Sequence, residues 1–250
     1  MRSVRTGGSD IVRTVTSFRT FLAALMAAMM CCAIAPEAAA QIGSELSLRV
    51  LRVGPGGGAR EGDWAGMLVE YEDSSLSTTG ARDVLLRVRG VDVDGDPPVY
   101  ERVVVAQGGQ PRSAWLYAKL PMNISVTSEL RLSAHEAVEA PASPRGVRAG
   151  RELARVDVPL ANVSPNNLGL IGVIGQRDLG LNQYARDWGA GLAWSPLGHE
   201  LDSVAVFGAG QLPDRWHGLA PFEVLVWGTG QENDPLAVSV PRARAVRQWV

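Results

Sequence analysis

Apolar and polar residues alternate along the first part of the chain, in short runs separated by turn-forming residues. Such alternation places one face of each run in a core and the other in water, which is typical of β-strands in packed sheets. Since no useful stretch of helical period interrupts this region, residues 41–161 predict a β-sandwich of about seven strands. The predicted strands lie within Leu46–Val53, Trp64–Tyr71, Val84–Val88, Tyr100–Ala106, Ala114–Leu120, Ser128–Ala134 and Leu153–Leu160.

The pattern changes after residues 162–167, whose Asn, Ser and Pro content predicts a linker. Leu168–Ile174 is almost continuously apolar, as expected of a strand that is buried on both faces of a sheet. The elements predicted beyond it are strands at Ser203–Phe207 and Phe222–Trp227 and a helix that begins near Pro241. Alternating strands and connections open a doubly wound sheet, so residues 168–250 predict a partial α/β domain.

The chain ends at Trp249–Val250, inside the predicted helix and on two large apolar residues. We therefore expect this sequence to be the N-terminal part of a larger protein, with the next strand of the sheet beyond Val250. Ligands of doubly wound sheets bind beyond the carboxyl ends of the strands. The loops at those ends are residues 175–178, 208–216 and 228–234.

The N-terminus has the pattern of a signal peptide. Its basic residues, Arg2, Arg5, Arg13 and Arg19, precede an uncharged apolar run of 15 residues, Phe21–Ala35. That run is shorter than the ~20 residues that span a bilayer. Ala38 and Ala40 then supply the small residues that a signal peptidase needs, which predicts a signal peptide over residues 1–40 and cleavage before Gln41. The alternatives are a buried helix and an uncleaved anchor.

Composition narrows the possible functions. Both cysteines, Cys31 and Cys32, lie in the apolar run, so the mature chain would have neither a disulfide, a thiolate metal site nor a cysteine nucleophile. A formal net charge of -2 gives no global electrostatic case for nucleic acid binding. Lys119 is the single lysine and does not stand in a P-loop motif. An exported protein without disulfides suits a bacterial envelope, in the periplasm or another extracytoplasmic location.

Residues 212–230 read Leu-Pro-Asp-Arg-Trp-His-Gly-Leu-Ala-Pro-Phe-Glu-Val-Leu-Val-Trp-Gly-Thr-Gly, a short segment that leads into an apolar strand and a glycine-rich loop. This arrangement resembles the class I glutamine-amidotransferase-like fold, which belongs with flavodoxin-like sheets. More closely, the chain resembles bacterial envelope proteins in which a signal peptide, a β-sandwich and an amidotransferase-like domain often precede a membrane anchor. The first half resembles immunoglobulin-like or fibronectin-III-like sandwiches, without the Cys-Trp-Cys core of immunoglobulin domains.

The resemblance implies a scaffold for recognition and not glutamine hydrolysis. Active amidotransferases carry a cysteine after the strand that follows this helix, and that strand would lie beyond Val250. The partner is then an unidentified protein or envelope component, and the membrane is involved only if a C-terminal part carries an anchor.

Asp214, Arg215 and Trp216 are the leading candidate binding residues, because a charged pair beside an aromatic in a strand-end loop can hold a ligand or a partner. The alternative is structural: Trp216 would pack on the sheet edge, and Asp214 would cap the turn after Pro213.

Asp92, Asp94 and Asp96 alternate around Gly95 and could supply oxygen ligands to calcium. The glycine comes one position too early for the calcium-loop motif, which favours an acidic hairpin turn.

The remaining motifs of chemistry are incomplete. The chain contains no G-x-S-x-G nucleophile motif, and Gly208-Ala-Gly210 lacks the third glycine of a dinucleotide-binding loop. We therefore expect an exported, non-enzymatic recognition protein without a cofactor. The alternatives are a fragment of a hydrolase-type enzyme with catalytic residues beyond Val250, and a calcium-dependent adhesion module.

Overall fold

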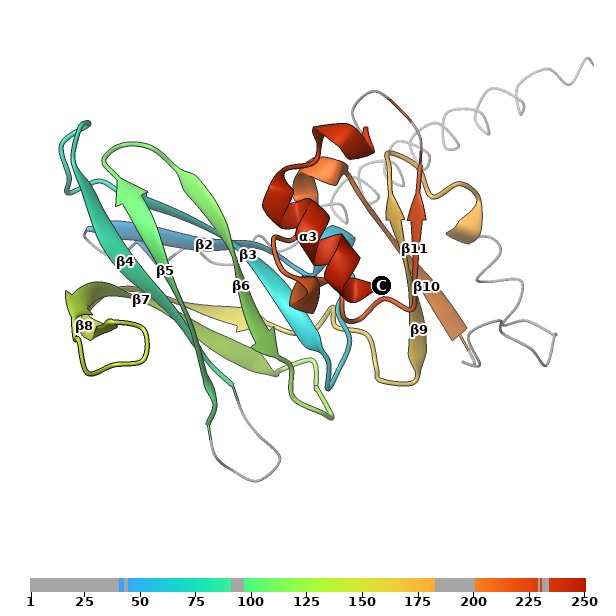
Figure 1. Ribbon diagram of the computed structural model, residues 1–250. Coiled ribbons are helices and arrows are strands. Elements are labelled where there is room, and N and C mark those ends of the chain that lie inside the picture. Colours follow the sequence, from blue (N-terminus) through green and yellow to red (C-terminus); the bar gives the residue numbers. More distant parts are fainter. Residues whose placement is uncertain (1–40, 43–44, 91–96, 183–200, 229, 231–233) are drawn as a thin grey trace, which may run out of the picture. The chain divides into compact units, whose positions relative to one another are not determined.

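Alternating strands build most of the protein, as the computed structural model shows (Figure 1). The structure describes residues 41–42, 45–90, 97–182, 201–228, 230 and 234–250. The chain is mostly β-sheet, and α3 (Val240–Trp249) is the α-helix that the structure describes over its whole length. The predicted signal peptide up to Ala40 and the aspartates at 92, 94 and 96 lie outside the described residues.

Two antiparallel four-stranded sheets form the first part of the described chain. One has the order β1-β2-β3-β6, with β1 (Gln41–Ile42), β2 (Leu46–Val53), β3 (Trp64–Asp73) and β6 (Arg112–Lys119). The other has the order β5-β4-β7-β8, with β5 (Val99–Gln107), β4 (Ala81–Arg89), β7 (Glu129–Glu139) and β8 (Val147–Pro159).

One apolar core takes side chains from both sheets. Leu48 of β2, Met67 of β3, Leu86 of β4 and Leu132 of β7 are each fully buried in it. The seven predicted strands all occur, and the alternate residues of each strand fill this core, as period-2 patterning requires. The coarse prediction of a β-rich fold is therefore confirmed.

The hairpin of β7 and β8 is longer than the sequence suggested. His135 and Glu136 lie beyond the predicted end of the strand at Ala134 but within β7, which runs to Glu139. Residues 147–152, which precede the predicted start of the next strand at Leu153, begin β8 and pair with that extension. The imidazole of His135 contacts the Ser133 hydroxyl at 2.9 Å, so it is held against the strand.

Three parallel strands follow: β9 (Leu168–Ile174), β10 (Leu201–Phe207) and β11 (Val224–Trp227). β9 lies between the other two, and Leu170 and Ile174 on one of its faces are fully buried. They share a second core with Phe207 and Phe222, and α3 packs against it through Val246 and Trp249. The near-continuous apolar character of β9 is thus explained by burial along its whole length.

The glycine-rich turn at residues 54–58 is a packing surface and not merely a flexible connection. Its 3-10 turn η2 (Pro55–Gly57) lies against β10. A Cβ atom on Gly58 would lie 2.6 Å from the Phe222 ring, and one on Gly56 would lie 2.7 Å from the Val206 carbonyl oxygen. Gly56 also has φ +61°, a conformation that glycine adopts at low cost. The glycines therefore allow the two parts of the chain to approach closely.

Candidate functional site

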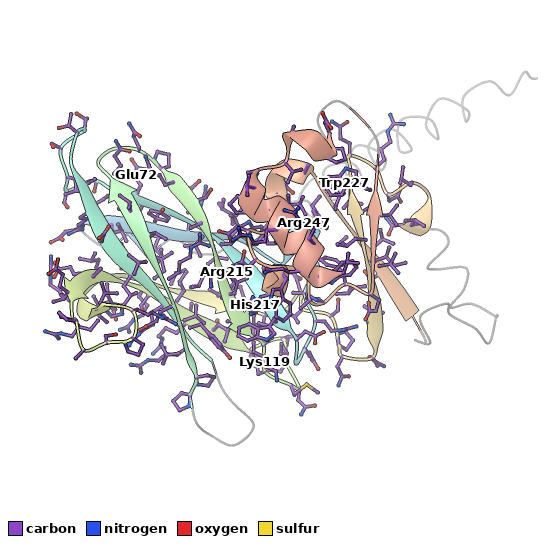
Figure 2. The ribbon with its side chains drawn as sticks, in the orientation of Figure 1. Glu72, Lys119, Arg215, His217, Trp227 and Arg247 are labelled. Atoms are coloured by element: carbon purple, nitrogen blue, oxygen red, sulfur yellow. The ribbon has the colours of Figure 1, made fainter. Side chains whose placement is uncertain are left out.

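The candidate residues lie in the connection between β10 and β11, which contains two 3-10 turns, η3 (Ala209–Gln211) and η4 (Trp216–Gly218). Leu212 and Leu219 are both fully buried in the second core. The residues between these two anchors reach the outer face of the sheet that contains β3 and β6 (Figure 2). The two buried leucines therefore anchor both ends of this segment, and the residues between them lie at the surface of the parallel sheet's core.

Asp214 is held by a bidentate ion pair. The guanidinium of Arg102 on β5 donates to Asp214 Oδ1 at 3.1 Å and to Oδ2 at 2.6 Å, and it also donates to the Trp115 carbonyl oxygen at 2.6 Å. Paired charge-assisted hydrogen bonds of this kind are among the stronger polar contacts in proteins.

The hydroxyl of Tyr117 on β6 completes this arrangement. It donates to Asp214 Oδ1 at 2.6 Å and accepts the backbone N–H groups of Asp214 at 3.0 Å and Arg215 at 3.2 Å. Gly218 lies over the same ring, where a Cβ atom would come within 2.9 Å of it. We call Arg102, Tyr117 and Asp214 the loop latch, because together they fasten the loop to strands of both antiparallel sheets.

The charges of the latch perturb its ionisation. Burial alone would raise the pKa of Asp214, but the hydrogen bonds from Arg102 and Tyr117 outweigh it and hold the pKa below its ordinary value of 3.8. Burial, reinforced by the Asp214 carboxylate, raises the pKa of Tyr117 well above its ordinary range. At neutral pH the latch is therefore one carboxylate, one guanidinium and one neutral phenol.

An aromatic cluster supports the end of the loop. The imidazole of His217 stacks on Trp216 with ring centres 4.1 Å apart and meets the edge of Trp64 at 4.7 Å. Trp64 in turn meets the ring of Tyr100 at 5.3 Å. Burial, together with the nearby charge of Arg215, lowers the pKa of His217, which keeps the imidazole neutral at neutral pH.

Arg215 and Trp216 are the exposed residues between the buried anchors Leu212 and Leu219. The Trp216 side chain is 37% exposed, and since His217 covers one face of the indole, the exposed part lies on the other face and the ring edges. Arg215 is exposed, and no carboxylate lies within ion-pair distance of it among the described residues. The loop thus presents a guanidinium and an indole on a fixed backbone.

A second polar cluster joins the segment before β3 to the parallel sheet. Arg60 pairs with Asp63 and with Glu223, and Glu223 also accepts the Leu170 N–H at 2.7 Å. An open cavity of about 280 Å³ lies beside these residues and is also lined by Glu61, Gly62, Met122 and Asn166. Because its arginine and two of its carboxylates are already paired with each other, this cavity offers few charged groups for binding a ligand. Within the described ranges, no three potential metal-ligating side chains lie together.

The structure separates the three predicted binding residues. Asp214 points into the latch, whereas Arg215 and Trp216 are displayed. The expected cap by Asp214 does not occur, because its carboxylate makes a long-range ion pair, whereas Trp216 stacks on His217.

Sequence reasoning missed the contributions of Arg102 and Tyr117. Arg102 lies on the same strand face as the core residues Val104 and Ala106. A charged residue at such a core-facing position needs a partner, so the sequence pattern did contain a signal for an ion pair at Arg102.

Two of the predicted strand-end loops meet at the carboxyl edge of the parallel sheet. The N–H of Gly175 donates to the Phe207 carbonyl at 2.9 Å, and that of Gly228 donates to the Ile174 carbonyl at 2.8 Å. Among the residues that the structure describes, no helix has the length and apolar character needed to cross a bilayer.

No protein-family model and no curated protein matches the chain. The sporulation control protein Spo0M from Bacillus subtilis is similar over 48% of this chain and 48% of its own, with 11% identity and a TM-score of 0.23. A cycloisomaltooligosaccharide glucanotransferase from Paenibacillus sp., solved with cycloisomaltoheptaose, is similar over 58% of this chain and 18% of its own, with 15% identity and a TM-score of 0.25. The chain thus spans about half or less of the length of these two proteins. TM-scores this low carry no argument about function.

Proposed function

We propose that this protein is an exported, non-enzymatic envelope protein that recognises a partner through Arg215 and Trp216. The observation that carries the proposal is that neighbouring residues of the loop have different environments. Asp214 is committed to the latch, and the next two residues are left exposed on a backbone that the latch fixes. Tryptophan and arginine are enriched among the residues that dominate binding energy at interfaces.

Rigidity supports this proposal. A displayed side chain binds more tightly when its loop does not have to be ordered on binding. The loop has fixed contacts on both sides of the displayed pair, through the latch, the buried Leu212 and Leu219, and a 2.7 Å hydrogen bond from Arg52 to Gln211.

The engagement of the ionisable side chains favours binding over catalysis. Asp214 and Glu223 are paired with arginines, and the His217 imidazole stacks on Trp216 and makes an edge-to-face contact with Trp64. A general base needs a reacting group within hydrogen-bond reach and commonly a third group that orients it. In the part of the chain that the structure describes, no group orients the His217 imidazole, since its Nδ1 atom is buried without a hydrogen-bond partner.

The finer fold class is part of the same proposal. In the antiparallel part, β2, β3 and β6 form one sheet and β5, β4, β7 and β8 the other, an arrangement that supports a fibronectin-III-like sandwich. The order β10-β9-β11 corresponds to the 2-1-3 order that begins flavodoxin-like sheets, which supports a doubly wound α/β segment. Both folds serve as scaffolds for many functions, so the site and not the fold carries the assignment.

Site-specific photo-crosslinking in the native bacterium tests the proposal. A benzophenone amino acid replaces Trp216 in one variant and the highly exposed Val126 in a matched control. We expect a discrete adduct, identified by mass spectrometry, from position 216 and not from position 126. An adduct from position 215 that disappears in Trp216→Ala would strengthen the assignment. Equal labelling at positions 216 and 126, or none at position 216, would refute it.

A further inference from the structure

The charges of the C-terminal part are distributed unevenly between its interior contacts and its surface. Two of its carboxylates, Asp214 and Glu223, are neutralised by Arg102 and Arg60, which come from the antiparallel part of the chain. Five arginines of this part form no ion pair with another described residue; they are Arg177, Arg215, Arg242, Arg244 and Arg247. Residues 235–250 contain no aspartate or glutamate. Positive charge is therefore concentrated in the segment of α3, residues 235–250, whereas carboxylates such as Asp178 and Asp234 lie elsewhere in the C-terminal part and the whole chain has a net charge of -2.

Helix α3 presents part of this charge on one stripe. Its opposite side faces the second core, where Ala245 is buried and Val246 and Trp249 are packed. Val240, Arg244 and Arg247 follow one another at spacings of four and three residues, so they share the outer face. Val240 is 69% exposed, which places an apolar side chain in the same stripe as two guanidinium groups.

The displayed loop borders this helix. Turn η4 packs directly against α3, and Arg215 and Trp216 stand at the start of that turn (Figure 2). We call Arg215, Trp216, Val240, Arg244 and Arg247 the basic face.

We propose that the basic face binds the anionic phospholipid headgroups of a membrane surface. This inference rests on the proposed function and names the envelope component that Arg215 and Trp216 recognise. Guanidinium groups pair with phosphate through two parallel hydrogen bonds. Charge alone would fit any polyanion, but an exposed valine and an exposed indole beside the arginines fit the headgroup region, where apolar side chains are partly buried and tryptophan is enriched.

The arrangement predicts the size of the effect. A basic residue close to an anionic bilayer strengthens binding about fivefold. Replacement of Arg244 and Arg247 should therefore weaken partitioning into anionic vesicles roughly 25-fold. Because the attraction is electrostatic, binding should also fall as salt shortens the screening length from ~10 Å at 0.1 M to ~3 Å at 1 M.

Vesicle co-sedimentation of the purified full chain provides the test. One set of vesicles contains phosphatidylcholine alone and the other also contains phosphatidylglycerol. The variant is Arg244→Gln/Arg247→Gln. The matched control is Arg89→Gln/Arg148→Gln, which removes the same charge from two exposed arginines of β4 and β8 that have no ion pair among the described residues.

We expect binding to the phosphatidylglycerol vesicles only, its loss in the α3 variant, and its retention in the control. Equal binding to both vesicle types would point to an apolar segment and overturn the inference, and so would equal loss in both variants. Free inorganic phosphate should not compete at millimolar concentration, because a bilayer presents many headgroups at once; full competition would identify an ordinary anion site. If vesicle binding is absent while benzophenone at position 216 captures a protein, the lipid inference fails and the proposed function stands.

Discussion

Removal of the Tyr117 hydroxyl should weaken the fold measurably, because three hydrogen bonds meet at that single oxygen atom. In Tyr117→Phe, Asp214 Oδ1 loses a donor at 2.6 Å, and the N–H groups of Asp214 and Arg215 lose their acceptor. The substitution leaves the ring in place, so it creates no cavity. The change therefore isolates the polar part of the latch.

The expected magnitude follows from the burial of these groups. Tyr117 is 7% exposed, so at least one orphaned N–H should bear most of a desolvation penalty of about 1–3 kcal/mol. The lost bond to a charged carboxylate adds about 1.5–3 kcal/mol. Water can reach the loop beside the exposed Arg215, which reduces the sum, and we expect a loss of about 3 kcal/mol in the free energy of unfolding. For a unit of this size, that loss lowers Tm by roughly 6–12 °C.

The assay is urea denaturation followed by tryptophan fluorescence and circular dichroism, with Tyr100→Phe as the matched control. The Tyr100 ring meets Trp64, but its hydroxyl takes part in no hydrogen bond among the described residues. The control should therefore change stability by less than about 0.5 kcal/mol. A Tyr117→Phe loss as small as that of the control would show that the latch does not stabilise the loop. A double-mutant cycle with Arg102→Met should give a coupling free energy of about 1 kcal/mol if the two side chains act together on Asp214.

Four further outcomes are expected. Gly58→Ala should destabilise the protein by about 3 kcal/mol, because the added Cβ atom overpacks the core. The control Gly57→Ala should cost about 1 kcal/mol, since its Cβ atom meets nothing within 4 Å but φ is +81°. Similar losses for the two variants in chemical denaturation would contradict this prediction. Because the native pKa of Asp214 is depressed, its stabilising contribution is present above pH 3.8 and is lost as pH falls through the lower native pKa. The free energy of unfolding of Asp214→Asn should therefore decline less steeply with acid than that of the unchanged protein. Identical pH dependence of the two proteins would refute the assignment. N-terminal sequencing of protein from the envelope should begin at Gln41, and an intact Met1 would exclude cleavage. Millimolar calcium should leave Tm unchanged if Asp92–Asp96 is a turn, and an increase that chelation reverses would favour the adhesion alternative.

Strand positions could be predicted from sequence because each strand carries its own signal. Leu46, Leu48 and Val50 alternate with polar residues and fill the first core, as expected. The extension of the hairpin between β7 and β8 was missed because Gly146, Arg148 and Gly150 have the composition of a loop. The pairing of residues 147–152 with β7 is a tertiary effect that local composition does not encode.

The candidate site was predicted only in part, because its geometry depends on residues far apart in sequence. The pattern around Pro213 indicates a turn, and Arg215 and Trp216 are indeed displayed there. Nothing local to Asp214 reveals that its partner is Arg102, which lies 112 positions earlier. A weaker signal was present on β6, where Trp115 and Tyr117 face away from the core yet are apolar or aromatic, which indicates a strand covered on both faces.

The glycine turn at residues 54–58 has a consequence for the order of folding. Its backbone lies against β10, about 150 positions later in the chain, so this contact closes one of the longest loops in the molecule. Contacts at such separation form late, since chain entropy must be lost before they stabilise anything. During synthesis the antiparallel strands emerge first and can complete their own core. We therefore expect them to act as a template on which the parallel strands assemble, so that a fault in this turn would appear chiefly as slow folding and aggregation of the C-terminal segment.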